Sequence, residues 1–364
     1  MDAPIELDIY YSDGAERSSV VGRYHAHTRR KTVFLFTSGA LLLLMLLISA
    51  SIGAIGISPA NVLRILLSGD LEGPGRIVWS VRMPRIVGAI LVGAALSLSG
   101  TVMQSVLRNP LASPYTLGLS NAAAFGAAFA IVVLSAGRAD SSSIAINSPY
   151  VVTISAFGFS LTAAAAVLLL AKLTRISATA MVLAGIAIGS MFAAGLTLMQ
   201  YLADSVQLAN IVSWTFGDLG RADLRAISMV TIAAVPSAVF LLHHRWEFNA
   251  MDAGDETAKG LGVNTERLRV AGMVAASLLS AISVAFFGII AFIGLLGPHI
   301  ARRVIGGDHR RLMYASPLLG AIILLASDTA ARSVLAPMVL PVGILTSMLG
   351  GPLFIYLLLR RRMQ

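Results

Sequence analysis

The chain contains few charged residues and no cysteine. Asp, Glu, Lys and Arg make up 12% of its 364 residues, whereas hydrophobic residues make up 57%, and the mean hydropathy is +0.82. Soluble domains carry about 25% charged residues, so this chain has too few to cover the surface of a water-soluble globule. The shortage excludes an ordinary cytosolic enzyme, a disordered chain and a nucleic-acid-binding domain, and it predicts an integral membrane protein.

The residues that carry most metal and nucleotide chemistry are also missing or scattered. Without Cys the chain has no disulfide, thiol nucleophile or thiolate metal site. Six His are present, but only His243 and His244 are adjacent, and no pair has the spacing of a helical metal site. The phosphate-binding pattern G-x-x-x-x-G-K-[ST] is absent as well. We therefore expect no directly bound metal or cofactor, and any ATP must be held by a partner.

Acidic residues are scarce inside the apolar runs, where Asp328 is the only acid at depth. An ion-coupled secondary transporter needs ionisable groups at depth, and an intramembrane enzyme needs a nucleophile with a base or paired carboxylates. The sequence supplies almost none of these. Arg332 follows Asp328 by four residues on the same helix face, so the two form either a local ion pair or a proton site. A nearby Arg keeps a carboxylate ionised, which argues against proton transfer.

Long apolar runs recur along the chain at close intervals. A spanning helix needs about 20 apolar residues to cross a bilayer core of about 30 Å. Such runs lie at residues 33–57, 84–107, 116–136, 150–172, 177–202, 226–243, 269–290, 312–333 and 341–359, and a shorter, broken run covers 291–305. The sequence therefore predicts an all-α, polytopic bundle of about ten transmembrane helices.

Small residues four apart occur in two of these predicted spans. Gly185, Gly189 and Ala193 form one row, and Gly93 with Ser97 forms another. Lipid tails are as apolar as Leu, so helices in a membrane associate where small side chains allow close approach. We expect both rows to be helix–helix contacts, with a substrate-lining role as the alternative.

The basic residues predict the orientation of the chain. When residues 1–32 are placed in the cytoplasm and the spans alternate, the cytoplasmic side holds more than twice as many Lys and Arg as the other side. Basic residues favour the cytoplasmic side, so both termini are predicted to be cytoplasmic. Residues 1–32 are expected to form a flexible cytoplasmic extension, and 33–364 the transmembrane domain. A signal peptide is disfavoured because Val33–Ile57 exceeds the usual apolar region of about 7–15 residues.

Four blocks of sequence carry a more specific pattern. The first comprises Arg82-Met-Pro-Arg85, Ser99-Gly-Thr-Val-Met-Gln104 and Arg108-Asn-Pro-Leu-Ala-Ser-Pro114. The second comprises Leu183-Ala-Gly-Ile-Ala-Ile-Gly189 and Trp214-Thr-Phe-Gly217, and the third is Gly254-Asp-Glu-Thr-Ala-Lys-Gly-Leu-Gly262. The fourth comprises Phe292-Ile-Gly-Leu-Leu-Gly-Pro-His299, Gly307-Asp-His-Arg310, Ser327-Asp-Thr-Ala-Ala-Arg332 and Leu340-Pro-Val-Gly-Ile344. In order and spacing, from about residue 34 to the C-terminus, these blocks resemble the FecCD-type permease subunits of type II ABC importers for ferric siderophores, haem and cobalamin.

The resemblance implies a docking site and a coupling site. It implies that Arg82, Arg85 and Arg332 pair with acidic residues of a periplasmic substrate-binding protein, with interfacial anchoring as the alternative. It implies that loop 244–268 contains a coupling helix that inserts into an ATPase subunit. The proposed coupling residues are Asp255, Glu256, Ala258, Leu261 and Gly262. Ala258 and Leu261 are expected to form a small apolar face, while acids in the first turn favour the helix dipole.

The resemblance also implies a cytoplasmic gate that includes Asn109, Leu111 and Thr179. At Asn109 a helix-end cap is an equal alternative, and near Thr179 this chain has Ala178 where relatives can show a second hydroxyl residue. Pro110, between Asn109 and Leu111, removes a backbone hydrogen-bond donor and turns the chain. An irregular segment is therefore expected after span 84–107.

The sequence as a whole predicts a transport subunit without catalytic residues, in the bacterial inner membrane. We expect a homodimer that works with an ATPase subunit, which binds ATP and Mg, and with a periplasmic binding protein. The expected cargo is a ferric siderophore, followed by haem and cobalamin. An ion-coupled secondary transporter is the alternative from another class.

Overall fold

The computed structural model describes residues 13–53, 55–136, 149–173 and 178–362, and all regular structure within these ranges is helical. The elements are α1 (Asp13–Ser51), α2 (Pro59–Ser68), α3 (Pro74–Ile77), the π-helical turn η1 (Val78–Arg82), α4 (Met83–Val106), α5 (Leu119–Val132), α6 (Pro149–Leu173), α7 (Ala178–Leu202), α8 (Ser205–Thr215), the 3₁₀ turn η2 (Leu219–Arg221), α9 (Leu224–His243), α10 (Arg245–Asp252), α11 (Asp255–Gly260), α12 (Thr265–Phe287), α13 (Ile293–Ile305), α14 (His309–Ala331) and α15 (Val342–Arg362).

The predicted all-α membrane fold is confirmed. In the part of the chain that the structure describes, seven helices are long and apolar enough to cross a membrane, and Leu119–Val132 and Val342–Leu353 are shorter apolar helices. The broken run at 291–305 forms α13, which has 13 residues. Together these elements correspond to the ten predicted runs.

Three boundaries differ from the sequence predictions. Helix α1 begins at Asp13, so the expected absence of regular structure in the N-terminal extension is wrong from that residue onwards. The span predicted at 84–107 begins earlier, because α3 and the π-helical turn η1 continue helix α4 back to Pro74. The helix predicted at 116–136 is shorter, because Gly118 adopts a left-handed φ of 77° immediately before α5.

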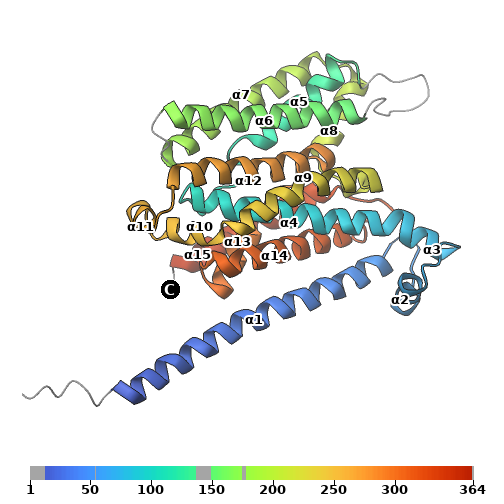
Figure 1. Cartoon of the computed structure of the whole chain (residues 1–364). Helices are drawn as coiled ribbons and strands as arrows, with labels where there is room; N and C mark the ends of the chain where they lie inside the picture. The colour runs from blue at the N-terminus through green and yellow to red at the C-terminus, as the bar shows by residue number, and fades with distance from the viewer. Residues whose placement is uncertain (1–12, 54, 137–148, 174–177, 363–364) are drawn as a thin grey trace, which may run out of the picture.

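Helix α4 occupies the centre of a layered bundle (Figure 1). It contacts α12, α13, α14 and α9, while α5, α6 and α7 form a layer on the far side of α12. Helix α1 crosses the opposite side obliquely and contacts α14. The most extensive helix pairing is that of α4 with α14, two helices far apart in sequence that run antiparallel.

Small residues allow α4 and α14 to pack this closely. A Cβ placed on Gly93 would lie 2.4 Å from the carbonyl oxygen of Gly320, so the two backbones touch there. One turn further along, Oγ of Ser97 lies 2.7 Å from Oγ of Ser316. The prediction that Gly93 and Ser97 mark a helix–helix contact is confirmed, and the hydroxyl pair adds a polar contact that lipid cannot offer.

The second small-residue row is also a helix–helix contact. A Cβ on Gly189 would lie 2.9 Å from Cα of Gly118, and one on Gly185 would lie 3.0 Å from Cα of Leu117. Helix α7 therefore packs directly against the segment that enters α5. A larger residue at either glycine would separate the two elements.

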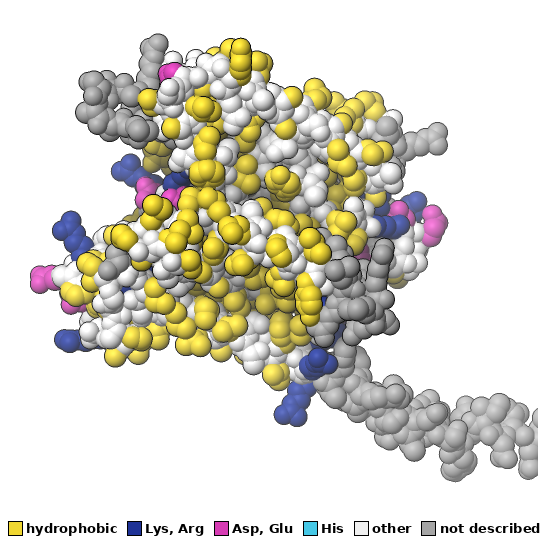
Figure 2. Space-filling view, turned by 180° about the vertical axis from the view of Figure 1, so that it is seen from behind, with side chains coloured by type: hydrophobic (Ala, Val, Ile, Leu, Met, Phe, Trp, Pro, Cys, Tyr) yellow, Lys and Arg dark blue, Asp and Glu magenta, His cyan; other side chains and the backbone are white. Residues whose placement is uncertain are grey.

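Charged side chains gather at the two ends of the bundle, while apolar side chains cover its flank (Figure 2). We call one end, formed by α2, α3, the start of α4 and the end of α14, the Asp328 end. The other, formed by the end of α4, by α10 and α11, and by the starts of α12 and α14, is the Asp255 end. The two ends lie on the right and left of Figure 1. Because α4 and α14 are antiparallel, both helices reach both ends.

Candidate functional site

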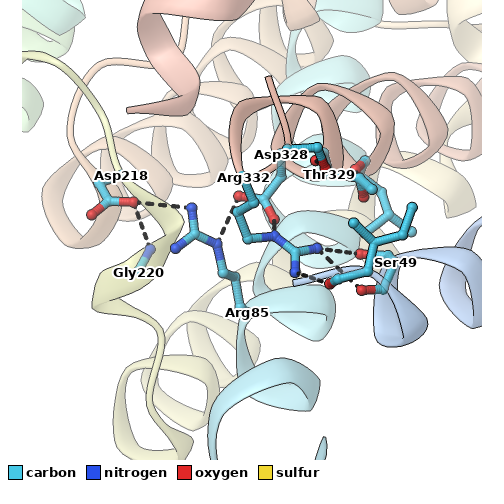
Figure 3. Close-up of polar contacts among 10 residues, drawn as sticks. Ser49, Arg85, Asp218, Gly220, Asp328, Thr329 and Arg332 are labelled. Atoms are coloured by element: carbon cyan, nitrogen blue, oxygen red, sulfur yellow. Dashed lines mark hydrogen bonds and ion pairs between the residues drawn. The ribbon is translucent and has the colours of Figure 1, made fainter. Parts of the chain in front are cut away.

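A buried carboxylate organises the Asp328 end (Figure 3). Oδ1 of Asp328 accepts a hydrogen bond from Nε of Arg85 at 2.8 Å, and Oδ2 accepts one from Nε of Arg332 at 3.1 Å. The Asp328 side chain is fully buried. The predicted local pair of Asp328 and Arg332 is therefore confirmed, and it is extended by an arginine 243 residues away in sequence.

The two arginines continue into neighbouring elements. Nη2 of Arg85 lies 3.4 Å from Oδ1 of Asp218, which in turn accepts the Gly220 amide at the start of η2. Arg332 donates to Oγ of Ser49 at 2.7 Å and to the Ile52 carbonyl at 3.0 Å, both in or just after α1. Two guanidinium groups and two carboxylates thus balance in charge and join α1, α4, α14 and the loop before α9.

Arg82 takes a different path from the other two predicted docking arginines. It is 5% exposed and donates to the carbonyl oxygens of Ala50 and Ile55, at the end of α1 and in the segment before α2. The Arg85 and Arg332 side chains are 13% and 9% exposed. Arg85 and Arg332 therefore share the Asp328 carboxylate, whereas Arg82 binds backbone carbonyls at the same end of α1 that Arg332 reaches, and all three are engaged inside the chain.

At the Asp255 end, a second carboxylate holds two arginines. Oδ1 of Asp255, the first residue of α11, lies 2.7 Å from Nη2 of Arg108 and 3.1 Å from Nη2 of Arg269. Arg108 follows α4 and Arg269 lies in α12. The Asp255 and Arg108 side chains are 34% and 46% exposed, so this cluster is in contact with solvent, unlike the one around Asp328.

A third carboxylate, Asp252 at the end of α10, lies beside this cluster. It accepts a hydrogen bond from Oγ of Ser105 at 2.5 Å and lies 2.8 Å from Nε2 of His309, whose side chain is buried. Burial raises the pKa of Asp252, but the hydrogen bonds from His309 and Ser105 together lower it more, so the pKa falls below its ordinary value. Asp252 is therefore a carboxylate at neutral pH, and it accepts a hydrogen bond from the N–H at Nε2 of His309.

Asp308 closes the start of α14. Its Oδ1 accepts hydrogen bonds from Nδ2 of Asn249 at 2.8 Å and from the Arg310 amide at 3.1 Å. Burial raises the pKa of Asp308, but hydrogen bonds from Arg310 and Asn249 outweigh it and lower the pKa to about 2. Asn249 of α10 also accepts the His309 amide at 2.6 Å, so α10 is bound directly to the first turn of α14.

Arg108 has an unusual backbone for its residue type. Its φ is 45°, its amide bonds to the Ser105 carbonyl, and the Asn109 amide bonds to the Gln104 carbonyl. This is the hydrogen-bond pattern of a helix C-terminus whose left-handed residue is usually Gly. A side chain in that conformation costs about 1–2 kcal/mol, and the solvent-exposed contact of the guanidinium with Asp255 returns at most about 1 kcal/mol of this.

The predicted coupling residues do not share one surface. The side chain of Glu256 is 96% exposed and Leu261 is 69% exposed, whereas Ala258 is fully buried. The expectation of a common apolar face of Ala258 and Leu261 is therefore wrong, because α11 is a helix of only six residues that turns Ala258 into the protein. Gly262 has a φ of 82°, which ends the segment with a left-handed turn.

The predicted gate residues lie near the Asp255 end, where Asn109 and Leu111 share a hydrogen bond. Oδ1 of Asn109 accepts the Leu111 amide at 2.9 Å, which is the local cap that sequence reasoning left open. Leu111 and Thr179 are exposed, and among the described residues no hydrogen bond joins Thr179 to either of the others. The segment from Arg108 to Gly118 is irregular, as expected from its prolines.

Sequence reasoning missed Asp218, Ser49, Asp252, Ser105 and His309. Each reaches its partner across a long stretch of chain. His309 lies in the fourth block, in Gly307-Asp-His-Arg310, but nothing local pairs it with Asp252. Asp218 follows directly after the block that ends at Gly217, which was its only signal. Among the described residues, no group of three or more His, Asp and Glu side chains could hold a metal ion.

Comparison with known proteins gives consistent matches over nearly the whole chain. The FecCD transport family matches residues 41–360. The chain is 48% identical over 343 residues to a protein of Methanocaldococcus jannaschii named for an ABC transporter permease, with 93% of this chain and 97% of that protein covered. It is 36% identical over 325 residues to the hemin transport system permease protein of Yersinia pestis, with 89% and 94% covered.

Other relatives are named as permeases for other cargoes, and a solved structure shares the fold. The relatives' names specify iron(3+)-citrate and iron(3+)-hydroxamate in Bacillus subtilis, and vitamin B12 in Salmonella typhimurium. The solved structure is of a metal-chelate type ABC transporter in an inward-facing conformation. It superposes with a TM-score of 0.76 at 30% identity and covers 90% of this chain and 99% of that chain.

Proposed function

The chain belongs to the FecCD transport family and is the permease subunit of an ABC importer, and we propose that this importer carries a ferric siderophore into the cytoplasm. The subunit is a membrane transport component rather than an enzyme. An ATPase subunit, which uses ATP, and a substrate-binding protein complete such an importer. The observation that carries the assignment is the family match over residues 41–360 of an all-helical, multi-span chain.

The proposed cargo rests on the relatives and on the scarcity of fixed charge at depth. Their names specify hemin, iron(3+)-citrate, iron(3+)-hydroxamate and vitamin B12, so two of these four cargoes are ferric chelates. Haem and cobalamin are the alternatives within the same architecture. The single acid in a described span that lies at depth, Asp328, is bound by two arginines, which disfavours an ion-coupled secondary transporter because no carboxylate is free to take up a coupling ion.

We assign opposite roles to the two ends of the bundle. The Asp255 end faces the cytoplasm, where Glu256 and Leu261 contact the ATPase together with Asp255 and Gly262, while the buried Ala258 holds the segment against the bundle. The Asp328 end faces the binding protein. Two copies of the chain form the pathway at their common axis, and ATP binding drives alternating access. Asn109, Leu111 and Thr179 remain the proposed cytoplasmic gate, and both termini are placed in the cytoplasm.

The geometry also defines how docking through Arg82, Arg85 and Arg332 would work. In the isolated chain these guanidinium groups are held by Asp328, Asp218 and backbone carbonyls. A carboxylate of the binding protein must therefore approach the partly exposed edge of Arg85 or Arg332, rather than meet a free side chain. Such partly solvated pairs contribute mainly to orientation and to the rate of encounter.

Uptake into proteoliposomes tests this function. Vesicles that hold the permease with its ATPase and trapped ATP are given binding protein outside with ferric siderophore, haem or cobalamin. ATP-dependent accumulation of the ferric siderophore alone supports the proposal, and accumulation of another cargo replaces the substrate. Uptake driven by a proton or sodium gradient without the ATPase would support the secondary transporter instead.

A further inference from the structure

The α10–α11 segment, residues 245–260, is connected to its surroundings in two ways. The backbone joins it to α9 on one side and to α12 on the other. Side chains join it to α4 and α14, which are distant in sequence. Asp252 contributes to both, since it accepts a hydrogen bond from Ser105 of α4 and lies 2.8 Å from Nε2 of His309 at the start of α14.

Asp255 provides the second side-chain connection to α4. Arg108 reaches it at 2.7 Å and also donates to the Met251 carbonyl at 3.3 Å, so one guanidinium binds both α11 and the end of α10. Arg269 of α12 reaches the other oxygen of the same carboxylate at 3.3 Å. Asp255 thus lies at a point where α4, α11 and α12 meet.

The helices that receive these connections extend to the far end of the molecule. Arg85 in the first turn of α4 and Asp328 in the last turn of α14 are bonded to each other. Along their length the two helices are in backbone contact at Gly93 and Gly320. A displacement of α10–α11 that moves the ends of α4 and α14 therefore moves them as one body.

We propose that Asp252 and Asp255 are positioning residues that transmit movement of the α10–α11 segment to the paired helices α4 and α14. The inference rests on the proposed function, which places the ATPase against this segment. It adds a defined route for the movement, carried by Ser105, His309 and Arg108, none of which contacts the ATPase in this proposal.

The backbone of Arg108 is an independent observation in favour of this route. The residue occupies a left-handed position, with φ 45°, at a helix end where Gly is favoured. An arginine kept in a conformation that disfavours it indicates that its side chain is needed there. The same feature provides a selective variant, because Arg108→Gly removes the guanidinium while relieving the backbone.

Two variants and one control test the route in the complete importer. Arg108→Gly and Asp255→Asn each remove the ion pair between Arg108 and Asp255. Glu266→Gln is the matched control, because Glu266 is an exposed acid in the first turn of α12 with no ion pair to the described residues. Substitutions along a coupling route change coupling by about threefold to tenfold, so we expect cargo moved per ATP hydrolysed to fall by that factor in both variants but not in the control. Arg108→Lys keeps the positive charge, so it should retain most of the cargo moved per ATP hydrolysed.

Hydrogen–deuterium exchange of the permease without its partners separates this inference from the proposed cargo. We expect amide exchange in residues 252–262 to rise about threefold to tenfold in Arg108→Gly and Asp255→Asn, with α5–α7 and the control unchanged. The increase in the double variant should be smaller than the two single increases combined, since both variants remove the contact of Arg108 with Asp255. Unchanged exchange overturns the connection whatever the cargo is. Increased exchange with unchanged transport per ATP shows that the connection exists but transmits nothing, and this also overturns the proposal.

Discussion

The two ends of the bundle use the same residue types in opposite ways. At the Asp328 end, one fully buried carboxylate is held between Arg85 and Arg332, and both arginines are largely covered. At the Asp255 end, Asp252, Asp255 and Arg108 are between one third and one half exposed, although Arg269 and Asp308 are 10% and 19% exposed. A buried charge that loses its partner is left without solvation, whereas an exposed one is solvated by water. The first cluster therefore behaves as a permanent joint and the second as one that can open and close.

The difference matters because α4 and α14 belong to both clusters. A transporter that changes shape needs at least one part that remains intact while another rearranges. The contacts of Gly93 with Gly320 and of Ser97 with Ser316 lie between the two ends. They pack so closely that they leave no room for the two helices to shift against each other. We infer that the Asp328 end and the α4–α14 pair form the rigid part, and that rearrangement is concentrated around α10 and α11.

The largest expected effect is that of Asp328→Asn. It leaves the buried Arg332 without a counter-charge and Arg85 with Asp218 alone, and breaking a buried pair in this way costs about 3–5 kcal/mol of unfolding free energy. We expect the melting temperature in detergent to fall by about 5–10 °C. Glu72→Gln, which changes an exposed acid at the same end, is the control. A loss no greater than that of the control would show that the Asp328 end is not a permanent joint.

A smaller loss is expected from Ser105→Ala at the other end. The substitution removes the hydroxyl that lies 2.5 Å from Oδ1 of Asp252, but water can replace it because the Asp252 side chain is 39% exposed. We expect the unfolding free energy to fall by about 1 kcal/mol, measured as a shift in melting temperature against Ser190→Ala, whose hydroxyl bonds only within its own helix. A loss as large as that of Asp328→Asn would remove the distinction between the two ends.

A still smaller contribution to the unfolding free energy is expected from the Asp308 carboxylate. The pH dependence of the melting temperature measures this contribution. The pKa of Asp308 is lowered to about 2 in the folded chain, below its ordinary value, so its carboxylate stabilises the fold above about pH 4 and the stabilisation is lost as the pH falls towards 2. Because the group is partly solvated, we expect a contribution below about 1 kcal/mol. Melting temperatures of the wild type and Asp308→Asn should differ at pH 7, and the difference should shrink below about pH 4 and vanish only as the pH falls through about 2. A difference that persists at low pH would assign the effect to packing instead of charge.

The sequence predicted those features that depend on local pattern. Hydropathy located the spans, the rows around Gly93 and Gly189 predicted their contacts, and the four-residue spacing predicted the pair of Asp328 with Arg332. It did not predict that Arg85 would reach Asp328 from another helix, because that contact depends on how α4 and α14 pack.

The coupling segment shows the same limit at closer range. The amino acids of α11 indicated an acidic first turn and an apolar side, but they did not show which side faces the protein. Ala258 is buried because α11 packs against α10 and α12, and those contacts are set by the surrounding helices. Likewise, Arg108 occupies a position whose backbone favours Gly, so no propensity rule would have selected it.

Glu256→Gln combined with Leu261→Ala is expected to have the smallest effect on stability. It is also the variant in which transport should be lost while the fold is kept. Both side chains point into solvent, and surface substitutions of this kind usually change the unfolding free energy by less than about 0.5 kcal/mol. If these residues contact the ATPase, the double variant should melt like the wild type while ATP hydrolysis continues without cargo uptake. Unchanged uptake would count against the assignment of α11 as the coupling element. A comparable drop in melting temperature would mean instead that this exposed surface supports the fold, so that the Asp255 end would no longer differ in kind from the Asp328 end.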